Sequence, residues 1–339
     1  MRTIVTTLFG AFLLGAACAS GAPLRVCATT SNLGSLVQAV GGEDVIVTTF
    51  AKGTEDPHFV EARPSFMKAL SEADLLVLTG LELEIGWLPI LVEHARNATI
   101  LPGAPAHLDA STAITPLAVP RGTVSRAMGD VHALGNPHYL LDPIAGLRVA
   151  AAVRDALGRL RPGAAAAFRT RYDAFRTRLG AKLLGAPLAE RYDVEKIAAL
   201  HALGALPAFL ATQTDAPPLA GWLGTLAPHR GVLAVADHDV WPYFARRFGI
   251  EVVGFLEPRP GYPPTSKHLL SVVKLVNTRH VPLLLTTAYF DAQHAELVAN
   301  GTGVAVVRMA NQVGARPGAD DYLSMIDYDV AQVARALAR

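Results

Sequence analysis

The sequence contains only two cysteines among its 339 residues. Cys18 lies in an N-terminal segment that we expect to be removed or lipidated, so Cys27 has no partner for an internal disulfide. Cys27 lies in the short apolar run 24–28, and we expect it to be a small buried side chain of a strand rather than a metal thiolate. The cysteine content therefore excludes a disulfide-stabilised scaffold.

Charged residues are also scarce, at 17% of the chain, and the formal net charge is only +1. Such a balance provides no basic face, so we expect no nucleic-acid partner. Hydrophobic residues make up 51% of the sequence, which indicates a packed globular protein. The length is sufficient for two ordinary domains, each with its own core.

Three motifs of enzymes are missing as well. The sequence has no His-Glu-x-x-His, no Gly-x-Ser-x-Gly and no P-loop. It therefore lacks the usual signatures of a zinc protease and of an α/β-hydrolase. Without a P-loop, any ATP hydrolysis coupled to this protein would belong to a partner.

The N-terminus is typical of an export signal. Arg2 supplies the positive start, Ile4 to Ala17 is apolar, and Ala17-Cys18-Ala19 fits a small-x-small cleavage site. We expect residues 1–22 to form this signal and the mature protein to reach the periplasm. Lipid anchoring at Cys18 is the alternative that we favour less, because Gly15 stands where a lipoprotein signal usually has leucine.

Strand and helix patterns alternate along most of the chain. Strands are expected at 25–29, 44–50, 74–79, 232–236, 251–255, 282–287 and 304–309. Helices are expected at 33–40, 64–73, 84–96, 240–248, 265–276, 291–299 and 321–336. Strands joined by crossover helices pair in parallel, which predicts an α/β fold of two doubly wound lobes.

A long helix is expected to connect the lobes. Residues 142–185 contain no strand pattern, and Pro162 suits the first turn of a helix. The apolar side chains that follow recur at spacings of four, three and four, at Phe168, Tyr172, Phe175 and Leu179. This spacing places them on one helix face. We therefore expect an N-terminal lobe at 23–160, a rigid connecting helix at 161–186 and a C-terminal lobe at 187–339.

Three histidines lie in short distinctive settings on the expected loops. His58 ends Glu-Asp-Pro-His, His138 stands in Gly-Asn-Pro-His-Tyr, and His238 follows the strand that ends at Ala236. Neutral imidazole is a common ligand for zinc and similar metals. Ligands in open α/β sheets bind beyond the carboxyl ends of the strands, so we expect these rings to meet in the cleft between the lobes.

The segments that carry these histidines resemble the metal receptors of bacterial ABC importers, the periplasmic binding proteins for zinc, manganese or iron. The resemblance covers nearly the whole mature chain and is carried by the motifs at 56–58, 80–84, 135–143, 243–250 and 257–261. It implies metal ligands at His58, His138 and His238, a site between the lobes, and an ABC permease of the inner membrane as partner. Three imidazoles favour zinc, with manganese or iron as alternatives. We expect a monomer and no enzymatic activity.

The fourth coordination position departs from the family pattern. The usual aspartate of an Asp-Pro-Leu-Gly turn is replaced by Asn311, and a second family carboxylate by Thr287. Water could complete a tetrahedron, Asn311 could bind weakly or orient that water, or Asp320 could reach the ion. We favour water.

Three further residues are weaker candidates. His132 could capture metal at the mouth of the site, but we favour a solvent-exposed histidine. Asp142 precedes Pro143 and is expected to cap the following helix. Glu84 receives no assignment.

Two other functions remain open from the sequence. A three-histidine zinc site with an open position is also the form of a zinc-dependent hydrolase. An adhesin or a metallochaperone could be built on the same fold, because function depends on the site rather than on the fold.

Overall fold

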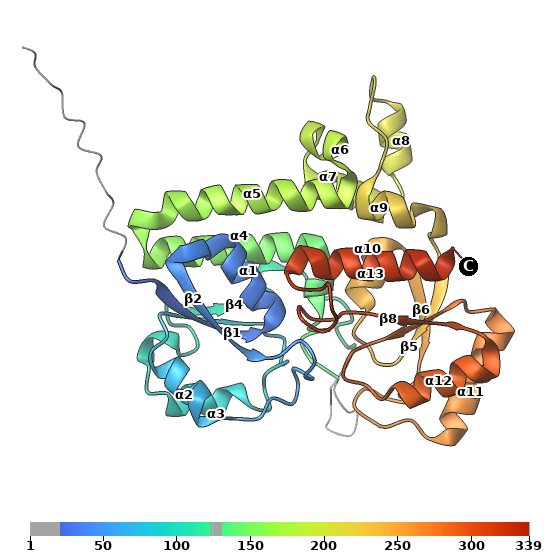
Figure 1. Ribbon diagram of the computed structural model, residues 1–339, viewed down its shortest axis with the longest axis horizontal. Coiled ribbons are helices and arrows are strands. Elements are labelled where there is room, and N and C mark those ends of the chain that lie inside the picture. The colour runs from blue at the N-terminus through green and yellow to red at the C-terminus, as the bar shows by residue number, and fades with distance from the viewer. Residues whose placement is uncertain (1–20, 123, 125–130, 339) are drawn as a thin grey trace, which may run out of the picture.

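The protein consists of two lobes, each built on a four-stranded parallel sheet (Figure 1). The computed structural model describes residues 21–122, 124 and 131–338. Cys18 and nearly all of the predicted export signal 1–22 lie outside these residues. The strand order is β2-β1-β3-β4 in the first sheet and β6-β5-β7-β8 in the second. The predicted fold class, two doubly wound α/β lobes, is confirmed.

The first lobe follows the expected alternation with small shifts at the ends of the elements. Its strands are β1 (Leu24–Thr30), β2 (Val45–Ala51), β3 (Leu75–Leu78) and β4 (His107–Asp109), and its helices are α1 (Ser31–Gly41), α2 (Pro64–Ser71) and α3 (Leu88–His94). β4 was not predicted, because three residues are too short for a recognisable pattern. Cys27 is 2% exposed in β1, as expected.

The second lobe also matches the expected pattern. Its strands are β5 (Val232–Ala236), β6 (Ile250–Phe255), β7 (Leu283–Thr286) and β8 (Ala305–Arg308), and its helices are α10 (Pro242–Phe248), α11 (Ser266–Arg279), α12 (Ala292–Thr302) and α13 (Tyr322–Leu337). Gly249 ends α10 in the left-handed conformation, which glycine adopts without strain. Asp321 begins α13 with a capping box that includes Ser324.

Between the two sheets the chain is helical. The segment comprises α4 (Pro143–Leu160), α5 (Ala165–Leu184), α6 (Ala186–Arg191), α7 (Val194–Ala202), α8 (Leu206–Ala211) and α9 (Gly221–Leu226). α5 contacts α1 and α4 of the first lobe and reaches α9 at its other end (Figure 1). The four apolar residues predicted to share a face of this helix are all buried. At 20 residues, α5 is about 30 Å long. None of the described helices is long and apolar enough to cross a membrane.

Helices cover both faces of each sheet. In the first lobe, α2 and α3 pack on one face through a cluster that includes Phe50, Leu76 and Trp87. In the second lobe, α11 and α12 do the same through a cluster that includes Leu269 and Leu284. The opposite faces of both sheets share one continuous core with α1, α4, α5 and α13. The lobes are therefore packed on a common apolar layer.

One expected helix starts later than predicted. The sequence indicated a helix at 84–96, but α3 begins only at Leu88, with Pro89 in its first turn. The preceding residues form turns, and Leu81 and Glu82 have φ values of 52° and 68°. Two successive non-glycine residues in this left-handed region cannot continue a right-handed helix.

The segment after β8 returns to the first lobe. The side chain of Asn32 in α1 donates to the carbonyl of Asn311 and accepts from the backbone N–H of Val313, at 3.2 and 2.8 Å. The Tyr322 backbone N–H donates to the Ser35 hydroxyl at 2.9 Å. The lobes are thus connected by this segment as well as by α5.

A partly buried ion pair connects α10 to the start of α4. Asp142 caps α4 by accepting from the Ile144 N–H at 2.9 Å, which confirms its predicted role. The same carboxylate accepts two bonds from the Arg247 guanidinium, at 2.7 and 2.8 Å. Arg247 also donates to the carbonyl of Ala198 at 2.9 Å. A bidentate pair of this kind fixes the relative orientation of the two helices.

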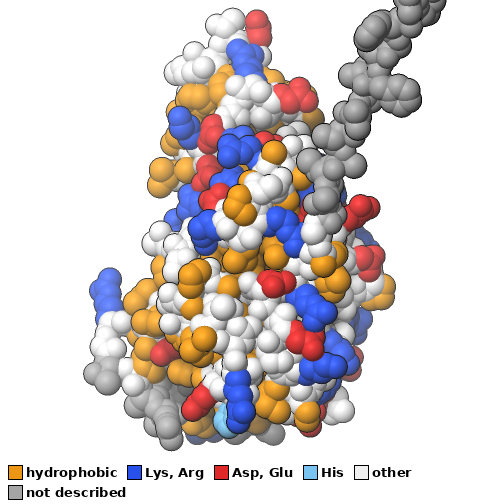
Figure 2. Space-filling model, turned by 90° about the vertical axis from the view of Figure 1, so that its left-hand side faces the viewer, with side chains coloured by type: hydrophobic (Ala, Val, Ile, Leu, Met, Phe, Trp, Pro, Cys, Tyr) orange, Lys and Arg blue, Asp and Glu red, His pale blue; other side chains and the backbone are white. Residues whose placement is uncertain are grey.

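Charges of both signs are mixed on the surface. Figure 2 shows the end of the molecule at the left of Figure 1, where Lys and Arg side chains lie among Asp and Glu side chains. Ion pairs of the first lobe include Arg25 with Glu72 and Arg171 with Asp44. The described residues of this face therefore carry no extended patch of one sign.

Replacing Arg247 by methionine should destabilise the fold. The substitution leaves the partly buried Asp142 carboxylate without its cationic partner, which costs about 2 kcal/mol in the free energy of unfolding. Urea unfolding of the variant measures this cost. The matched control is Arg246→Met, because Arg246 is the exposed neighbour on the same helix. Equal stability of the two variants would contradict the assigned role of the ion pair.

Candidate metal centre

Three loops bring the predicted histidines together. His58 lies on the loop after β2, His138 directly precedes the short 3₁₀ helix Tyr139–Leu141, and His238 follows β5. The centroid of the His58 ring is 5.3 Å from that of His138 and 6.1 Å from that of His238. The rings of His138 and His238 are 6.4 Å apart. The rings converge as expected; their role as metal ligands stays a prediction.

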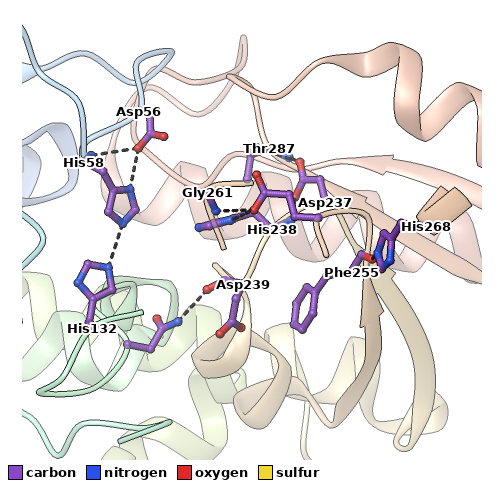
Figure 3. Close-up of polar contacts among 12 residues, drawn as sticks. Asp56, His58, His132, Asp237, His238, Asp239, Phe255, Gly261, His268 and Thr287 are labelled. Atoms are coloured by element: carbon purple, nitrogen blue, oxygen red, sulfur yellow. Dashed lines mark hydrogen bonds and ion pairs between the residues drawn. The ribbon is translucent and has the colours of Figure 1, made fainter. Parts of the chain in front are cut away.

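A fourth histidine lies against these three. The Nε2 atoms of His132 and His58 are 3.1 Å apart, and the two rings stack with centroids 5.2 Å apart (Figure 3). His132, His138 and His238 line a common cavity of about 50 Å³. The expectation of a solvent-exposed His132 is therefore wrong: its side chain is half-buried and faces the site. The position of His132 six residues before His138, on the same loop, is the feature of the sequence that could have indicated its place near the site.

Carboxylates orient two of the rings. Nδ1 of His58 lies 2.7 Å from the Asp56 carboxylate (Figure 3). Nδ1 of His238 lies 2.5 Å from the Glu257 carboxylate. Glu257 is itself held by the backbone N–H of Gly261 at 3.0 Å. When Nδ1 carries the proton, the lone pair is on Nε2, which is the arrangement that a metal ligand needs. The orienting roles of Asp56 and Glu257 were not predicted, although both residues lie in the motifs that carried the family resemblance.

The protonation of the rings differs across the site. Burial lowers the pKa of His132 to about 4 and that of His138 well below its usual value, and neighbouring histidines add to both shifts. Burial also opposes the charged form of His238, but the hydrogen bond and charge of Glu257 raise the pKa of that ring on balance. His132 and His138 are therefore neutral at pH 7, whereas His238 holds a proton more readily than an ordinary histidine.

The four rings do not yet form a coordination sphere. Within the described residues, no three His, Cys, Asp or Glu side chains are arranged so that they could hold one ion. Among His58, His138 and His238, the two longest centroid distances both involve His238, which belongs to the second lobe.

Two oxygen candidates for the fourth position differ in where they lie. Asp320 is exposed and lines a separate cavity beside Arg178 and Tyr322. Asn311 is 4% exposed and shares a cavity of about 20 Å³ with His138. Its side-chain oxygen has no hydrogen-bond partner in the described structure, and a cavity of this size can hold one water. The structure thus keeps Asn311 near the site and places Asp320 elsewhere.

Thr287 takes part in positioning the second-lobe histidine. Its backbone N–H and its hydroxyl donate to one oxygen of the buried Asp237 carboxylate, at 2.5 and 2.9 Å. The other oxygen accepts from the backbone N–H of His238 at 2.8 Å. Asp237 therefore fixes the turn that presents His238, with Thr287 as its anchor.

Comparisons with known proteins agree with this architecture. The family model described as the periplasmic component A of the zinc-uptake complex, ZnuA, matches residues 26–183 and 222–336. The manganese-binding lipoprotein MntA of Halalkalibacterium halodurans is 24% identical over 313 residues, which cover 91% of this chain and 87% of that protein. The iron-binding protein YfeA of Yersinia pestis is 22% identical over 322 residues, which cover 93% and 86%.

Solved structures show the same fold. A crystal structure of ZnuA superposes with a TM-score of 0.66 at 20% identity, covering 93% of this chain and 99% of that chain. A manganese-bound periplasmic metal-binding protein from Candidatus Liberibacter asiaticus gives a TM-score of 0.64 at 18% identity, covering 92% and 98%. Because the family model matches most of both lobes, the chain belongs to the ZnuA family, the extracytoplasmic substrate-binding proteins of metal ABC importers, and is not an enzyme.

Proposed function

We propose that this protein captures zinc in the periplasm through His58, His138 and His238 and delivers it, as a monomer, to an inner-membrane ABC permease. The supporting observation is the convergence of these rings from three loops, with Nδ1 of His58 and of His238 bound to a carboxylate. A ring whose Nδ1 donates to a carboxylate keeps its Nε2 lone pair free, as zinc ligation requires, and Nε2 of His58 faces that of His132 at 3.1 Å. Metal is the cargo of this site and not a resident cofactor.

The ligand chemistry favours zinc over manganese. Imidazole nitrogen suits zinc, whereas manganese prefers hard oxygen ligands. The carboxylates of Asp56 and Glu257 are occupied by histidine Nδ1 atoms and orient the rings. Relatives are named for manganese and for iron binding, and these ions are the alternatives that a competition experiment would distinguish.

The cavity at the histidines does not favour a zinc hydrolase. Sites for small organic molecules usually measure roughly 300–1,000 Å³. The cavity lined by His132, His138 and His238 measures about 50 Å³, which suits an ion and its ligands rather than an organic substrate.

Replacing His138 by alanine should weaken zinc binding by more than about 100-fold, because losing a ligand costs more than losing an orienting partner. Competition with a zinc chelator measures the change. His94→Ala is the matched control, since His94 is exposed on α3 and its ring hydrogen-bonds to the carbonyl of Ile90 in its own helix. Equal affinities of the two variants would show that the site is wrongly assigned.

Zinc affinity should fall as the pH falls from 7.5 to 5.5. Zinc binds the neutral ring, and the pKa of His238 is raised, so protons compete at this ring at a higher pH than at an ordinary histidine. Displacing one proton per ion weakens binding by about tenfold per pH unit below that pKa. His132 and His138, whose pKa values are lowered, add no competition in this interval. Isothermal titration at both pH values tests the effect, and an unchanged affinity would contradict it.

Export should remove the predicted signal without adding lipid. Protein recovered from the periplasm should begin after Ala19 and no later than Pro23, because the small-x-small site precedes this range. Intact-mass spectrometry determines the mature N-terminus. A mature chain that begins with a lipid-modified Cys18 would support the anchored alternative instead.

A further inference from the structure

His132 is held in place by a strained turn of the first lobe. Leu81 and Glu82 both have positive φ, a conformation that costs energy for residues other than glycine. The ring of His132 hydrogen-bonds to the backbone of Leu81. The next residue, Ala133, donates its backbone N–H to the Glu82 carboxylate at 2.8 Å. The loop of His132 is therefore docked on this turn at two successive residues.

A buried carboxylate stabilises this turn. Glu84 is 3% exposed and accepts hydrogen bonds from the backbone N–H groups of Thr79 and Gly80, at 2.7 and 3.1 Å. It also accepts from the Thr29 hydroxyl at 2.6 Å. Glu84, which had no role from sequence reasoning, thus stabilises the turn that receives the His132 loop.

These contacts determine which nitrogen of His132 faces the site. Its Nε2 lies 3.1 Å from Nε2 of His58, so Nδ1 is the nitrogen left for the contact with the Leu81 backbone. Nδ1 of His58 donates to Asp56. When both Nδ1 atoms carry the proton, two Nε2 lone pairs face each other, and either a proton on one ring or a cation bound to both rings stabilises this contact. Zinc bonds of about 2.0–2.1 Å in a tetrahedron separate neighbouring ligand atoms by about 3.3 Å, close to the observed spacing.

We propose that His132 is a fourth imidazole ligand of the captured metal, so that the ion is held by four nitrogens without a bound water. The proposal rests on the proposed function and replaces water as the expected fourth ligand. The 3.1 Å pair of His58 and His132 is already at ligand spacing, and both His138 and His238 border the same cavity as His132. Asn311 then only lines the neighbouring small cavity and does not bind the ion.

A closed set of four nitrogens also has a consequence for selectivity. Tetrahedral nitrogen coordination suits zinc, while manganese favours more ligands and hard oxygen donors. His132 would therefore raise the preference for zinc over manganese beyond what three histidines and a water provide.

X-ray absorption at the zinc edge tests the proposal on the full mature protein loaded with one equivalent of zinc. We expect imidazole scattering from four rings in the unaltered protein. His132→Ala and His132→Gln should each show three rings and an oxygen ligand, with zinc affinity lowered by at least about tenfold. The His94→Ala control should retain four rings. Circular dichroism and thermal unfolding check that the variants remain folded.

The outcomes separate this proposal from the proposed function. Three rings and an oxygen in the unaltered protein, with no change in either His132 variant, would overturn the role of His132 alone. Zinc binding that survives both His132→Ala and His138→Ala unchanged would overturn the proposed site as a whole. Loss of one ring in only the His132 variants, with His94→Ala unaffected, supports the proposal.

Discussion

The hydrogen bonds that fix the histidine rings are the interaction on which the site depends. An imidazole is a good metal ligand only when one nitrogen is deprotonated and directed at the ion. Asp56 and Glu257 hold Nδ1 of His58 and His238 from opposite lobes, and the Leu81 backbone contacts the ring of His132. Each partner lies on a different loop, so the orientation of the rings depends on the fold of both lobes.

The scaffold limits how these loops can move. A continuous apolar core joins the sheets to α4 and α5, and the pair of Asp142 with Arg247 attaches α10 to the start of α4. The segment 311–322 adds hydrogen bonds between the end of the second sheet and α1. Such connections favour small shifts over wide domain opening.

The hydrophobic periodicity of the sequence, together with the Gly and Pro residues at the ends of its elements, was sufficient to predict the two lobes and the connecting helix. It also placed the three histidines on loops. The roles of Asp56, Glu257 and His132 were not predictable in this way, because they depend on which side chains meet across loops that are distant in sequence. His132 does not lie in a distinctive sequence motif. The turn that it contacts, at Leu81 and Glu82, has a left-handed backbone where the local sequence pattern predicts a helix. Hydrogen bonds to Glu84 stabilise that turn although the local sequence favours a helix. Such tertiary contacts cannot be predicted from the pattern of a single sequence.

Imidazoles from both lobes are expected to enclose one ion. Anomalous diffraction at the zinc absorption edge, from crystals of the zinc-loaded protein, locates that ion. We expect one strong anomalous peak within bonding distance of Nε2 of His58, His138 and His238, at about 2.0–2.1 Å from each. A peak located elsewhere, or one that contacts histidines of a single lobe only, would contradict it.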